Sequence, residues 1–227
     1  MSFIVAIDGP AGVGKGTIAK RVADDLGLIT IDTGATYRSV TVAILENNIK
    51  LEELDKIAEL LKNIKIELIL EGKNQKVFLN GEDVTTKIRE DEVNNLVSKV
   101  SSIKEVRAEM VNLQRKLAEG KNVIMEGRDI GTVVFPKANI KIFLDASLEE
   151  RAMRRYKQNQ ETGIDKELSY NEVYESIKNR DYNDRNKPIG ALKQAEDAIL
   201  VDTTGMSLED NIRRVEKLVK ERMLENK

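Results

Sequence analysis

The sequence predicts an α/β fold in which a parallel sheet of five strands is flanked by helices. Two observations lead to this prediction. Five short apolar runs alternate with stretches of helical periodicity, and a glycine-rich segment follows the first run. The chain has 227 residues, of which 41% are hydrophobic, so it can bury one sizeable core or a core with inserted lobes.

Each predicted core strand is a short apolar run that ends at a polar turn. The first run, Phe3 to Ile7, is closed by Asp8-Gly9-Pro10 and fits a buried strand. We expect the other core strands at residues 28–31, 123–125, 140–144 and 199–201.

Helical spacing and end signals predict the helices between these strands. Ile18, Val22 and Leu26 share one helical face, and Gly27 follows as a C-terminal glycine commonly does, which predicts a helix over 15–26. Asp32-Thr33-Gly34 is a turn that can cap the next helix. Further helices are expected as a pair within 35–62 broken near Asn47-Asn48, at about 90–100, 103–119, 147–158 and 169–185, and after Ser207-Leu208-Glu209-Asp210, which resembles a capping box.

A change of periodicity after residue 63 indicates a small antiparallel insertion. Apolar residues at 64, 66, 68 and 70 alternate with polar ones, and the stretch then turns at Glu71-Gly72-Lys73-Asn74. A second run, 77–79, leads to Asn80-Gly81. This pattern is typical of a hairpin, and its position inside the strand–helix series predicts a lobe on the main domain.

The composition excludes several classes of chemistry and partner. The chain has no Cys and no His, which excludes disulfides, thiol chemistry and a catalytic histidine and argues against a zinc site. Its net charge of -2 argues against non-specific binding to nucleic acid. No apolar run reaches the ~18 residues of a membrane span, and MSFIVAIDGP is too short for a signal segment. We therefore expect a soluble, cytoplasmic protein without membrane or nucleic-acid partners.

The segment IDGPAGVGKGT, residues 7–17, matches a phosphate-binding loop at all positions but one. Gly9, Gly14 and Lys15 fit the pattern of Gly, four residues, Gly, Lys and then Ser or Thr. Gly16 stands where the hydroxyl residue is expected, and Thr17 follows one place late. In such loops backbone N–H groups converge on phosphate oxygens, the next helix points its positive end at them, and the lysine adds a cation between the β- and γ-phosphates.

Two other interpretations of this segment are weaker. The first is a glycine-rich strand–helix turn with a chance lysine. This interpretation does not explain why the motif spacing and the strand–helix context occur together. A dinucleotide-binding fingerprint fails because Thr17 stands where the third glycine is needed.

Six features together resemble the bacterial-type cytidylate kinases, a family of nucleoside monophosphate kinases among the P-loop NTPases. The loop has the form GxxGxGKGT, in which those enzymes normally have glycine after the lysine. The hairpin insertion at about 63–85 also fits the family. The remaining segments are IDTGATYR (31–38), EGRDIGTVVFP (126–136), KIFLDASLEERAMRR (141–155) and RDYNDRNKP (180–188), in the family's order and spread over essentially the whole chain.

The resemblance implies a P-loop kinase core with a lid segment and a monophosphate-binding lobe that carries the β insertion. On this reading residues 1–227 form a single domain. Its core is about 1–62, 120–146 and 190–227, the monophosphate-binding lobe is about 63–119 and the lid is about 147–189. The implied reaction transfers the γ-phosphoryl group of ATP to CMP or dCMP, with Mg²⁺ accompanying ATP, in pyrimidine nucleotide metabolism. A monomer is expected from the family.

The resemblance assigns the donor-nucleotide residues. Lys15, Arg128, Arg151 and Arg155 are implied catalytic residues, and Thr17 would serve phosphate and magnesium. Arg151, Arg154 and Arg155 lie at i, i+3 and i+4 of one helix, where a lid could close on ATP. The alternative is an ordinary helix surface, in which Glu150 at i+4 to Arg154 offsets part of the repulsion between these like charges. The expected ATP-binding set is Gly9, Pro10, Ala11, Gly12, Val13, Gly14, Lys15, Gly16, Thr17 and Arg154.

The resemblance also assigns the acceptor site. Arg38 would hold the monophosphate with both guanidinium ends, and Arg128 would touch phosphate. Asp129, Ser98 and Arg107 supply the acceptor and donors that cytosine recognition needs, although without the family Ser98 and Arg107 would be plain helix surface. Arg180 and Asp184 are placed at the ribose hydroxyls, and Arg185 near phosphate. The expected acceptor set is Thr33, Arg38, Ser98, Arg107, Arg128, Asp129, Arg180, Asp184, Arg185 and Lys187.

The chain departs from the family pattern at two positions. Glu126 stands where Asp is common, and Lys187 stands where Arg is frequent and keeps the charge without the bidentate geometry. The absence of His is no obstacle, because the nucleophile is an ionised phosphate oxygen and needs no general base. Lys15, the lid arginines, Arg38 and Mg²⁺ would neutralise the developing charge.

Three other functions are consistent with parts of this pattern. A GTPase switch would need Asn-Lys-x-Asp, but Asn186-Lys187-Pro188-Ile189 lacks the Asp. A non-catalytic nucleotide sensor could keep the fold, although the full arginine set argues against it. Another small-molecule P-loop kinase, acting on UMP, adenylate or shikimate, is the nearest rival; the hairpin insertion and the EGRD segment favour cytidylate.

Overall fold

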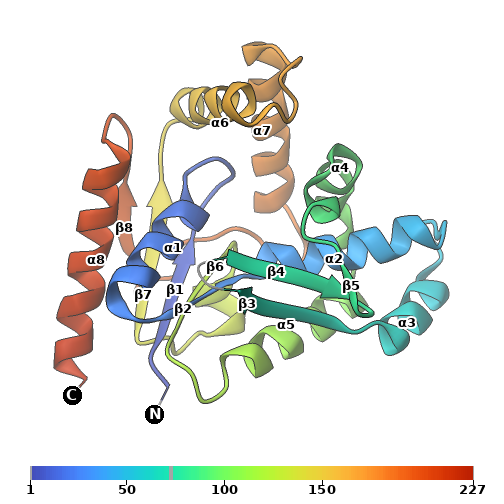
Figure 1. Ribbon diagram of the computed structural model, residues 1–227, viewed down its shortest axis with the longest axis horizontal. Helices are drawn as coiled ribbons and strands as arrows, with labels where there is room; N and C mark the ends of the chain where they lie inside the picture. Colours follow the sequence, from blue (N-terminus) through green and yellow to red (C-terminus); the bar gives the residue numbers. More distant parts are fainter. Residues whose placement is uncertain (1, 72–73, 227) are drawn as a thin grey trace. The chain divides into compact units, whose positions relative to one another are not determined.

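A computed structural model describes residues 2–71 and 74–226 of the chain (Figure 1). The chain divides into two compact units, and each is described by itself. The first unit is formed by Met1–Thr30 and Ala118–Lys227, and the second by Ile31–Leu117. The predicted turn at Gly72-Lys73 lies outside the described residues.

The main sheet has five strands, as the sequence predicts. They are β1 (Ile4–Asp8), β2 (Ile29–Asp32), β6 (Val123–Gly127), β7 (Ile140–Asp145) and β8 (Ile199–Asp202), in the order β2-β6-β1-β7-β8. β1 pairs in parallel with both β6 and β7, and β7 pairs in parallel with β8. Asp8 at the end of β1 is therefore level with Gly127 of β6 and Phe143 of β7. Loops that follow these three strands start at one edge of the sheet, where open α/β sheets bind ligands.

Helices α1 (Lys15–Leu26) and α8 (Leu208–Glu225) cover the sheet of the first unit. Val22 of α1 and Val215 of α8 are fully buried together with Val5 of β1 and Leu144 of β7. α1 ends at Gly27, whose φ of 67° is the left-handed conformation predicted for it. The helices α6 (Leu148–Thr162) and α7 (Tyr170–Arg185) pack on each other and enclose a smaller apolar cluster.

The second unit joins helices to a small antiparallel sheet, the predicted hairpin. Its sheet contains β3 (Ile66–Glu71), β4 (Asn74–Leu79) and a short third strand, β5 (Glu82–Asp83), which the sequence did not indicate. Asp32 caps the following helix as predicted, because Ala35 N–H donates to its Oδ1 at 3.1 Å. The helices are α2 (Thr33–Glu46), α3 (Leu54–Asn63), η1 (Lys87–Arg89), α4 (Asp91–Val100) and α5 (Lys104–Ala118).

The second unit takes in more of the chain than the insertion alone. The sequence predicts residues 31–62 as part of the core, whereas α2 and α3 pack with the hairpin and with α4 in one apolar cluster. Val40 and Ile44 of α2, Ile57 of α3 and Val100 of α4 are almost completely buried in it. The reason is that α2 is buried around most of its circumference, with ten of its residues buried.

A π-helix, η2 (Ile130–Val134), follows β6 and was not predicted. Its bonds run over five residues: Val134 N–H donates to Asp129 O at 3.2 Å, and Phe135 N–H donates to Ile130 O at 2.7 Å. The Asp8 carboxylate accepts the N–H groups of Ile130 and Gly131, each at 2.8 Å. Asp8 thus accepts the free N–H groups at the start of η2, a role that a side chain close in sequence fills in many helices.

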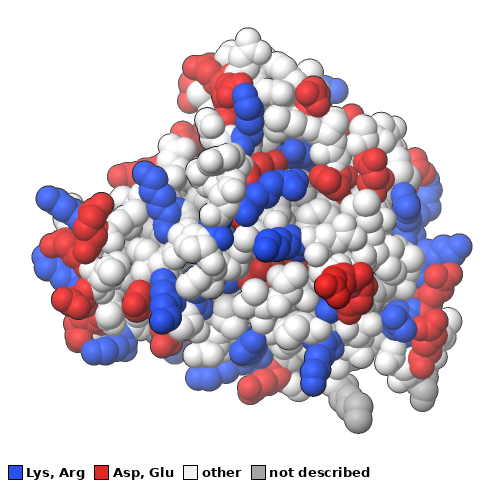
Figure 2. All heavy atoms as spheres, turned by 180° about the vertical axis from the view of Figure 1, so that it is seen from behind, with Lys and Arg blue, Asp and Glu red and all other residues white. Residues whose placement is uncertain are grey.

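The surface carries both signs of charge. Lys and Arg side chains alternate with Asp and Glu over the face in Figure 2, in keeping with the net charge of -2. Across residues 2–71 and 74–226, no helix has the length and apolar character needed to cross a membrane.

Gly9 should be the glycine of the first unit that is hardest to replace. A Cβ there would lie 2.2 Å from the backbone oxygen of Leu144, whereas a Cβ on Gly27 would meet nothing within 4 Å. We expect Gly9→Ala to lower the free energy of unfolding by about 2–3 kcal/mol through overpacking. Gly27→Ala, which suffers only the strain of positive φ, should lose about 1 kcal/mol. Urea denaturation of both variants checks this, and equal losses would contradict it.

Candidate active site

The loop between β1 and α1 has the backbone of a phosphate-binding site. Gly9, Gly12 and Gly14 have φ values of 155°, 74° and 92°, which other residues rarely adopt. Lys15 begins α1, is only 6% exposed, and its Nζ donates to Pro10 O at 2.8 Å. The lysine therefore folds back over the loop, and the N-terminus of α1 opens onto the same loop.

Burial shifts the pKa values of the two ionisable residues that flank the loop. Burial lowers the pKa of Lys15 to about 7, helped by the positive charges of Arg128 and Arg180 and opposed by Glu126 and Asp8. Burial raises the pKa of Asp8 to about 6, although the N–H groups of Gly131 and Ile130 lower it. Lys15 thus interacts with the positive charges of Arg128 and Arg180 at the edge of the sheet. A bound polyanion would offset this repulsion.

Glu126 explains why glycine follows the lysine. A Cβ on Gly16 would lie 3.3 Å from Glu126 Oε1, closer than most Cβ contacts. Glu126 is near the end of β6, and its charge acts on Lys15. Gly16 thus leaves room for a carboxylate beside the phosphate loop, while Thr17 stays exposed on the first turn of α1.

The tip of the loop is held by an ion pair from the two helices α6 and α7. Arg151 of α6 and Asp181 of α7 are buried, with Nη1 and Oδ2 2.6 Å apart. Arg151 Nη1 also donates to Ala11 O at 2.9 Å, and Ala11 N–H donates to Asp181 Oδ1 at 3.1 Å. Arg151 Nε donates to Ala146 O at 3.0 Å. These contacts place Arg151 beside the loop backbone.

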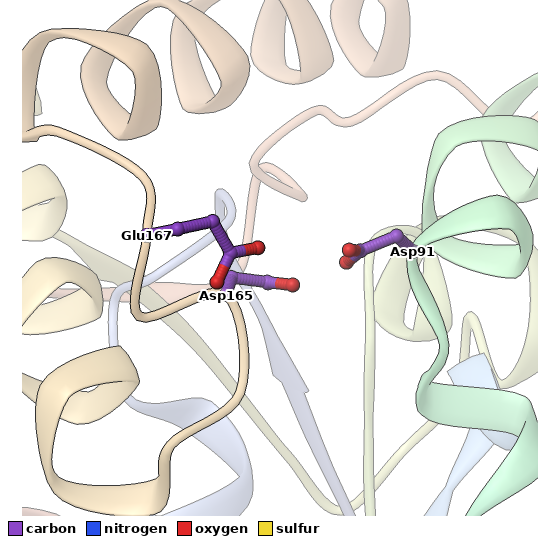
Figure 3. A group of neighbouring side chains, drawn as sticks. All are labelled: Asp91, Asp165 and Glu167. Carbon is purple, nitrogen blue, oxygen red and sulfur yellow. The ribbon is translucent and has the colours of Figure 1, made fainter.

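The other two arginines predicted for the lid have different surroundings. Arg154 donates to Thr203 O at 2.7 Å and to Thr203 Oγ1 at 3.0 Å, and its Nη2 lies 2.9 Å from Glu150 Oε1, the offsetting pair that the sequence suggested. Arg155 is half-exposed and lies 3.6 Å from Asp165. Asp165 projects from the segment between α6 and α7, with Glu167 next to it (Figure 3). Figure 3 also draws Asp91, the first residue of α4 in the second unit.

Arg128 and Lys187 pair with the buried Asp184 in the first unit. Asp184 Oδ2 accepts from Arg128 Nε at 2.9 Å, and its Oδ1 lies 2.8 Å from Lys187 Nζ. Burial alone would raise the pKa of Asp184, but the charges of Arg128, Lys187 and Arg180 hold it well below its usual range. Asp184 is thus an anion at neutral pH among cations. The neighbouring Arg185 is exposed.

Arg38 is the most conspicuous of the predicted acceptor residues in the second unit. Its Nη2 donates to Asp32 Oδ2 at 2.7 Å, and its Nε is buried without a hydrogen-bond partner among the described residues. Burial would raise the pKa of Asp32, but the charge of Arg38 keeps it below its ordinary value. Thr33 is buried at the first position of α2, one residue after Asp32. A buried guanidinium N–H of this kind suits an anion.

Arg107 and Ser98 lie on α5 and α4 of the same unit. Arg107 is buried, its guanidinium carbon lies 5.7 Å from the centre of the Tyr37 ring, and its Nη1 donates to Ser101 O at 3.5 Å. Ser98 is half-buried, and its backbone oxygen accepts the hydroxyl groups of Ser101 and Ser102. Arg107 is therefore not the plain helix surface that its local sequence suggests.

Some of the predicted residues lie together in each unit. In the first unit, the charges of Arg128 and Arg180 act on Lys15 of the loop at residues 9–17, and Arg128 donates to Asp184. Asp129 is buried where η2 begins. In the second unit, Thr33 and Arg38 lie at the start of α2. Sequence reasoning missed Asp8 and Asp181. Asp8 ends a strand beside the loop, which is a usable signal, whereas Asp181 looks like an ordinary helix residue.

A parallel sheet with a phosphate loop after its first strand, and converging lysine and arginine side chains at that edge, defines a P-loop kinase fold and site. A solved structure of a gluconokinase from Sinorhizobium meliloti is similar in fold, with a TM-score of 0.52 and 12% identity, covering 99% of this chain and 94% of that one.

The sequence matches the family model for cytidylate kinase over residues 5–221. The chain is 51% identical to a cytidylate kinase of Fusobacterium nucleatum over 96% of this chain and 97% of that protein. It is 50% identical to one of Bacillus subtilis over 91% of each. The chain therefore belongs to the cytidylate kinase family, as the sequence motifs predicted.

Replacing Lys15 should stabilise the fold in a pH-dependent way. Because folding lowers the pKa of Lys15 from 10.5 to about 7, the unfolded chain holds more protons between these values, and stability rises with pH there. The burial penalty is thus complete below pH 7. We expect Lys15→Met to raise Tm by about 5 °C at pH 6, with a gain that shrinks toward pH 10.

Melting curves of Lys15→Met and the wild type from pH 6 to 10 provide the measurement. Lys20→Met, a half-exposed position in the same helix, is the matched control and should leave the difference small and constant with pH. A Lys15→Met gain that grew with pH would contradict the burial argument.

The crowding between Gly16 and Glu126 predicts a rescue. In Gly16→Ala the new Cβ forces Glu126 to move by a few tenths of an ångström, which we expect to lower kcat about 3–10-fold. Combining it with Glu126→Asp, whose carboxylate is withdrawn by one methylene, should restore most of the loss. Steady-state kinetics of the two single variants and the double variant test this; strictly multiplicative losses would show that the two positions are independent.

Proposed function

We propose that this member of the cytidylate kinase family transfers the γ-phosphoryl group of ATP to CMP or dCMP, giving ADP and CDP or dCDP. The observation that carries the proposal is the convergence of Lys15, Arg128 and Arg180 at the phosphate loop. Their mutual repulsion is costly in the free protein and would be offset by their attraction to phosphate groups bound between them. Phosphoryl transfer needs this alignment and charge neutralisation more than it needs a general base.

The donor site would be the loop at residues 9–17 with α1. Its backbone N–H groups would bind the β-phosphate, and Lys15 would reach the β- and γ-phosphates. A phosphate beside Lys15 would raise the pKa of its amine from about 7 toward its ordinary value, so that the lysine carries a full charge in the complex. Arg155, which is half-exposed on α6, is the lid arginine that we propose for the γ-phosphate.

Mg²⁺ fits the groups beside the loop. Thr17 presents an exposed hydroxyl on the first turn of α1, and the Glu126 carboxylate lies next to Gly16. Hydroxyl, carboxylate and phosphate oxygens are the ligands that Mg²⁺ prefers, and Mg²⁺ commonly keeps several waters at nucleotide sites. We propose that Thr17 holds the ion, with Glu126 fixing its water. When bound, it would neutralise charge on the transferred phosphoryl group.

We propose acceptor-binding residues in each unit. Arg38, with its unpartnered buried Nε, is proposed to hold the acceptor phosphate. Ser98, Arg107 and Asp129 are proposed to recognise cytosine, and Thr33 and Arg185 to complete the phosphate surroundings. Asp184, held ionised by Arg128 and Lys187, is a hydrogen-bond acceptor suited to a ribose hydroxyl, with Arg180 beside it. Lys187 acts here through Asp184 as a point charge.

We further propose that the protein works in the cytoplasm as a monomer, without nucleic-acid or membrane partners. A kinase for another small-molecule acceptor remains the second candidate, favoured by the fold, which a gluconokinase shares. The two candidates differ in the acceptor, which the phosphate loop does not select.

A panel of acceptors decides between them. ADP release should be fastest with CMP and dCMP, at least about 10-fold slower with UMP, because a carbonyl replaces the exocyclic amine facing Asp129, and absent with AMP, gluconate and shikimate. Arg38→Met should reduce kcat/KM for CMP about 100-fold by removing the phosphate clamp. The exposed Arg213→Met on α8 is the control and should be unchanged. Preference for any acceptor other than CMP or dCMP would refute the proposed substrate.

A further inference from the structure

We infer that the buried Arg151–Asp181 ion pair positions the phosphate loop, so that α6 and α7 form part of the frame of the donor site. This inference rests on the proposed function. It gives Arg151, predicted from sequence to contact ATP directly, the role of a positioning residue that acts through Ala11.

Both backbone groups of one loop residue are bound by the pair. Arg151 Nη1 donates to the carbonyl of Ala11, and the Asp181 carboxylate accepts its N–H. The other oxygen of Asp181 lies 2.6 Å from Arg151 Nη1, so the three residues close a ring of contacts. The carbonyl and N–H of Ala11 are thereby fixed in direction, and a loop that binds phosphate through backbone N–H groups depends on such orientation.

Packing at the loop tip supports the same role. Ala11 is buried in the apolar cluster of Ala152, Val173 and Ile177, which belongs to α6 and α7. A Cβ on Gly12 would lie 3.1 Å from the backbone oxygen of Arg151, so the loop touches the backbone of α6. The tip of the loop is thus built into the α6–α7 pair, which the loop motif itself does not indicate.

The geometry of Arg151 also limits its reach. Its Nε donates to Ala146 O at 3.0 Å, and its Nη1 contacts both Ala11 O and the Asp181 carboxylate. The side chain is 6% exposed. To contact a nucleotide phosphate with the same atoms, Arg151 would have to leave Asp181 as a lone buried anion, which is strongly unfavourable.

Direct binding measurements test the inference. We expect Asp181→Asn, which is isosteric but uncharged, and Arg151→Met each to weaken ATP binding ~10-fold in calorimetry, the effect of losing one charge-assisted anchor. CMP binding, measured without ATP, should change less than ~3-fold because the loop serves the donor. Arg151→Lys should lie between, since it keeps the charge opposite Asp181 but loses the planar fork.

The double variant Arg151→Met/Asp181→Asn separates positioning from folding. It leaves no lone buried charge, and its ATP affinity should fall no further than that of the weaker single variant, because one ring of contacts is lost in each case. Asp197→Asn is the control: it breaks the ion pair with the buried Lys141 in the same unit, 2.7 Å apart, away from the loop tip, and should leave ATP binding unchanged.

Two results would overturn the inference. ATP and CMP affinities could fall together in folded variants, or ATP affinity could stay at the wild-type value. If every variant of the pair failed to fold at 15 °C, the pair would be a folding element and the positioning role would be rejected. A wild-type protein that binds no ATP would instead refute the proposed function, so the two failures are distinguishable.

Discussion

Positive charge gathered at the end of one buried strand is the constraint on which the rest of this structure depends. Burial and the positive charges of Arg128 and Arg180 all disfavour the charged form of Lys15, and together they lower its pKa to about 7. Carboxylates around the group balance that repulsion only in part, because each also has a structural partner. Under the proposed function, a bound polyphosphate would complete this balance of charge, as expected of a functional site.

The carboxylates near Lys15 and Arg128 reduce this repulsion while the oxygens of two of them contact specific donors. Asp8 directs both oxygens at the N–H groups of η2, and Asp184 directs its oxygens at Arg128 and Lys187. A side chain at residue 16 would crowd Glu126, because a Cβ there would lie 3.3 Å from Glu126 Oε1. Asp8 and Asp184 are therefore fixed in direction by specific donors, while Asp8 and Glu126 moderate the field around Lys15.

Local features of this chain were predictable from the sequence, and long-range ones were not. The apolar runs gave the strands, and the spacing of Gly9, Gly14 and Lys15 gave the loop, because both patterns lie within one short segment. η2 could not be foreseen, since its N–H groups are satisfied by Asp8, 122 residues earlier. Likewise, the contact of Asp181 with Ala11 spans 170 residues and leaves no trace in the helical pattern around it.

Gly16 shows how a local pattern gains meaning from a distant residue. By sequence it is a departure from the general phosphate loop and a mark of one kinase family. In the structure, a Cβ at this position would crowd the carboxylate of Glu126, which is 110 positions away in the chain. Pattern matching could assign the family but not this reason, since the reason depends on β6 lying beside β1.

Helix α7 is the element through which the two ends of the proposed reaction are physically joined. Asp181 and Asp184 lie one turn apart and are both buried on its inner face. The first faces the tip of the phosphate loop, and the second pairs with Arg128 and Lys187, which we place at the acceptor. A rotation of α7 would disturb both sets of contacts at once. Under the proposed function, α7, with these two acidic residues one turn apart, would set the separation of donor and acceptor groups, which in-line phosphoryl transfer requires to be fixed closely.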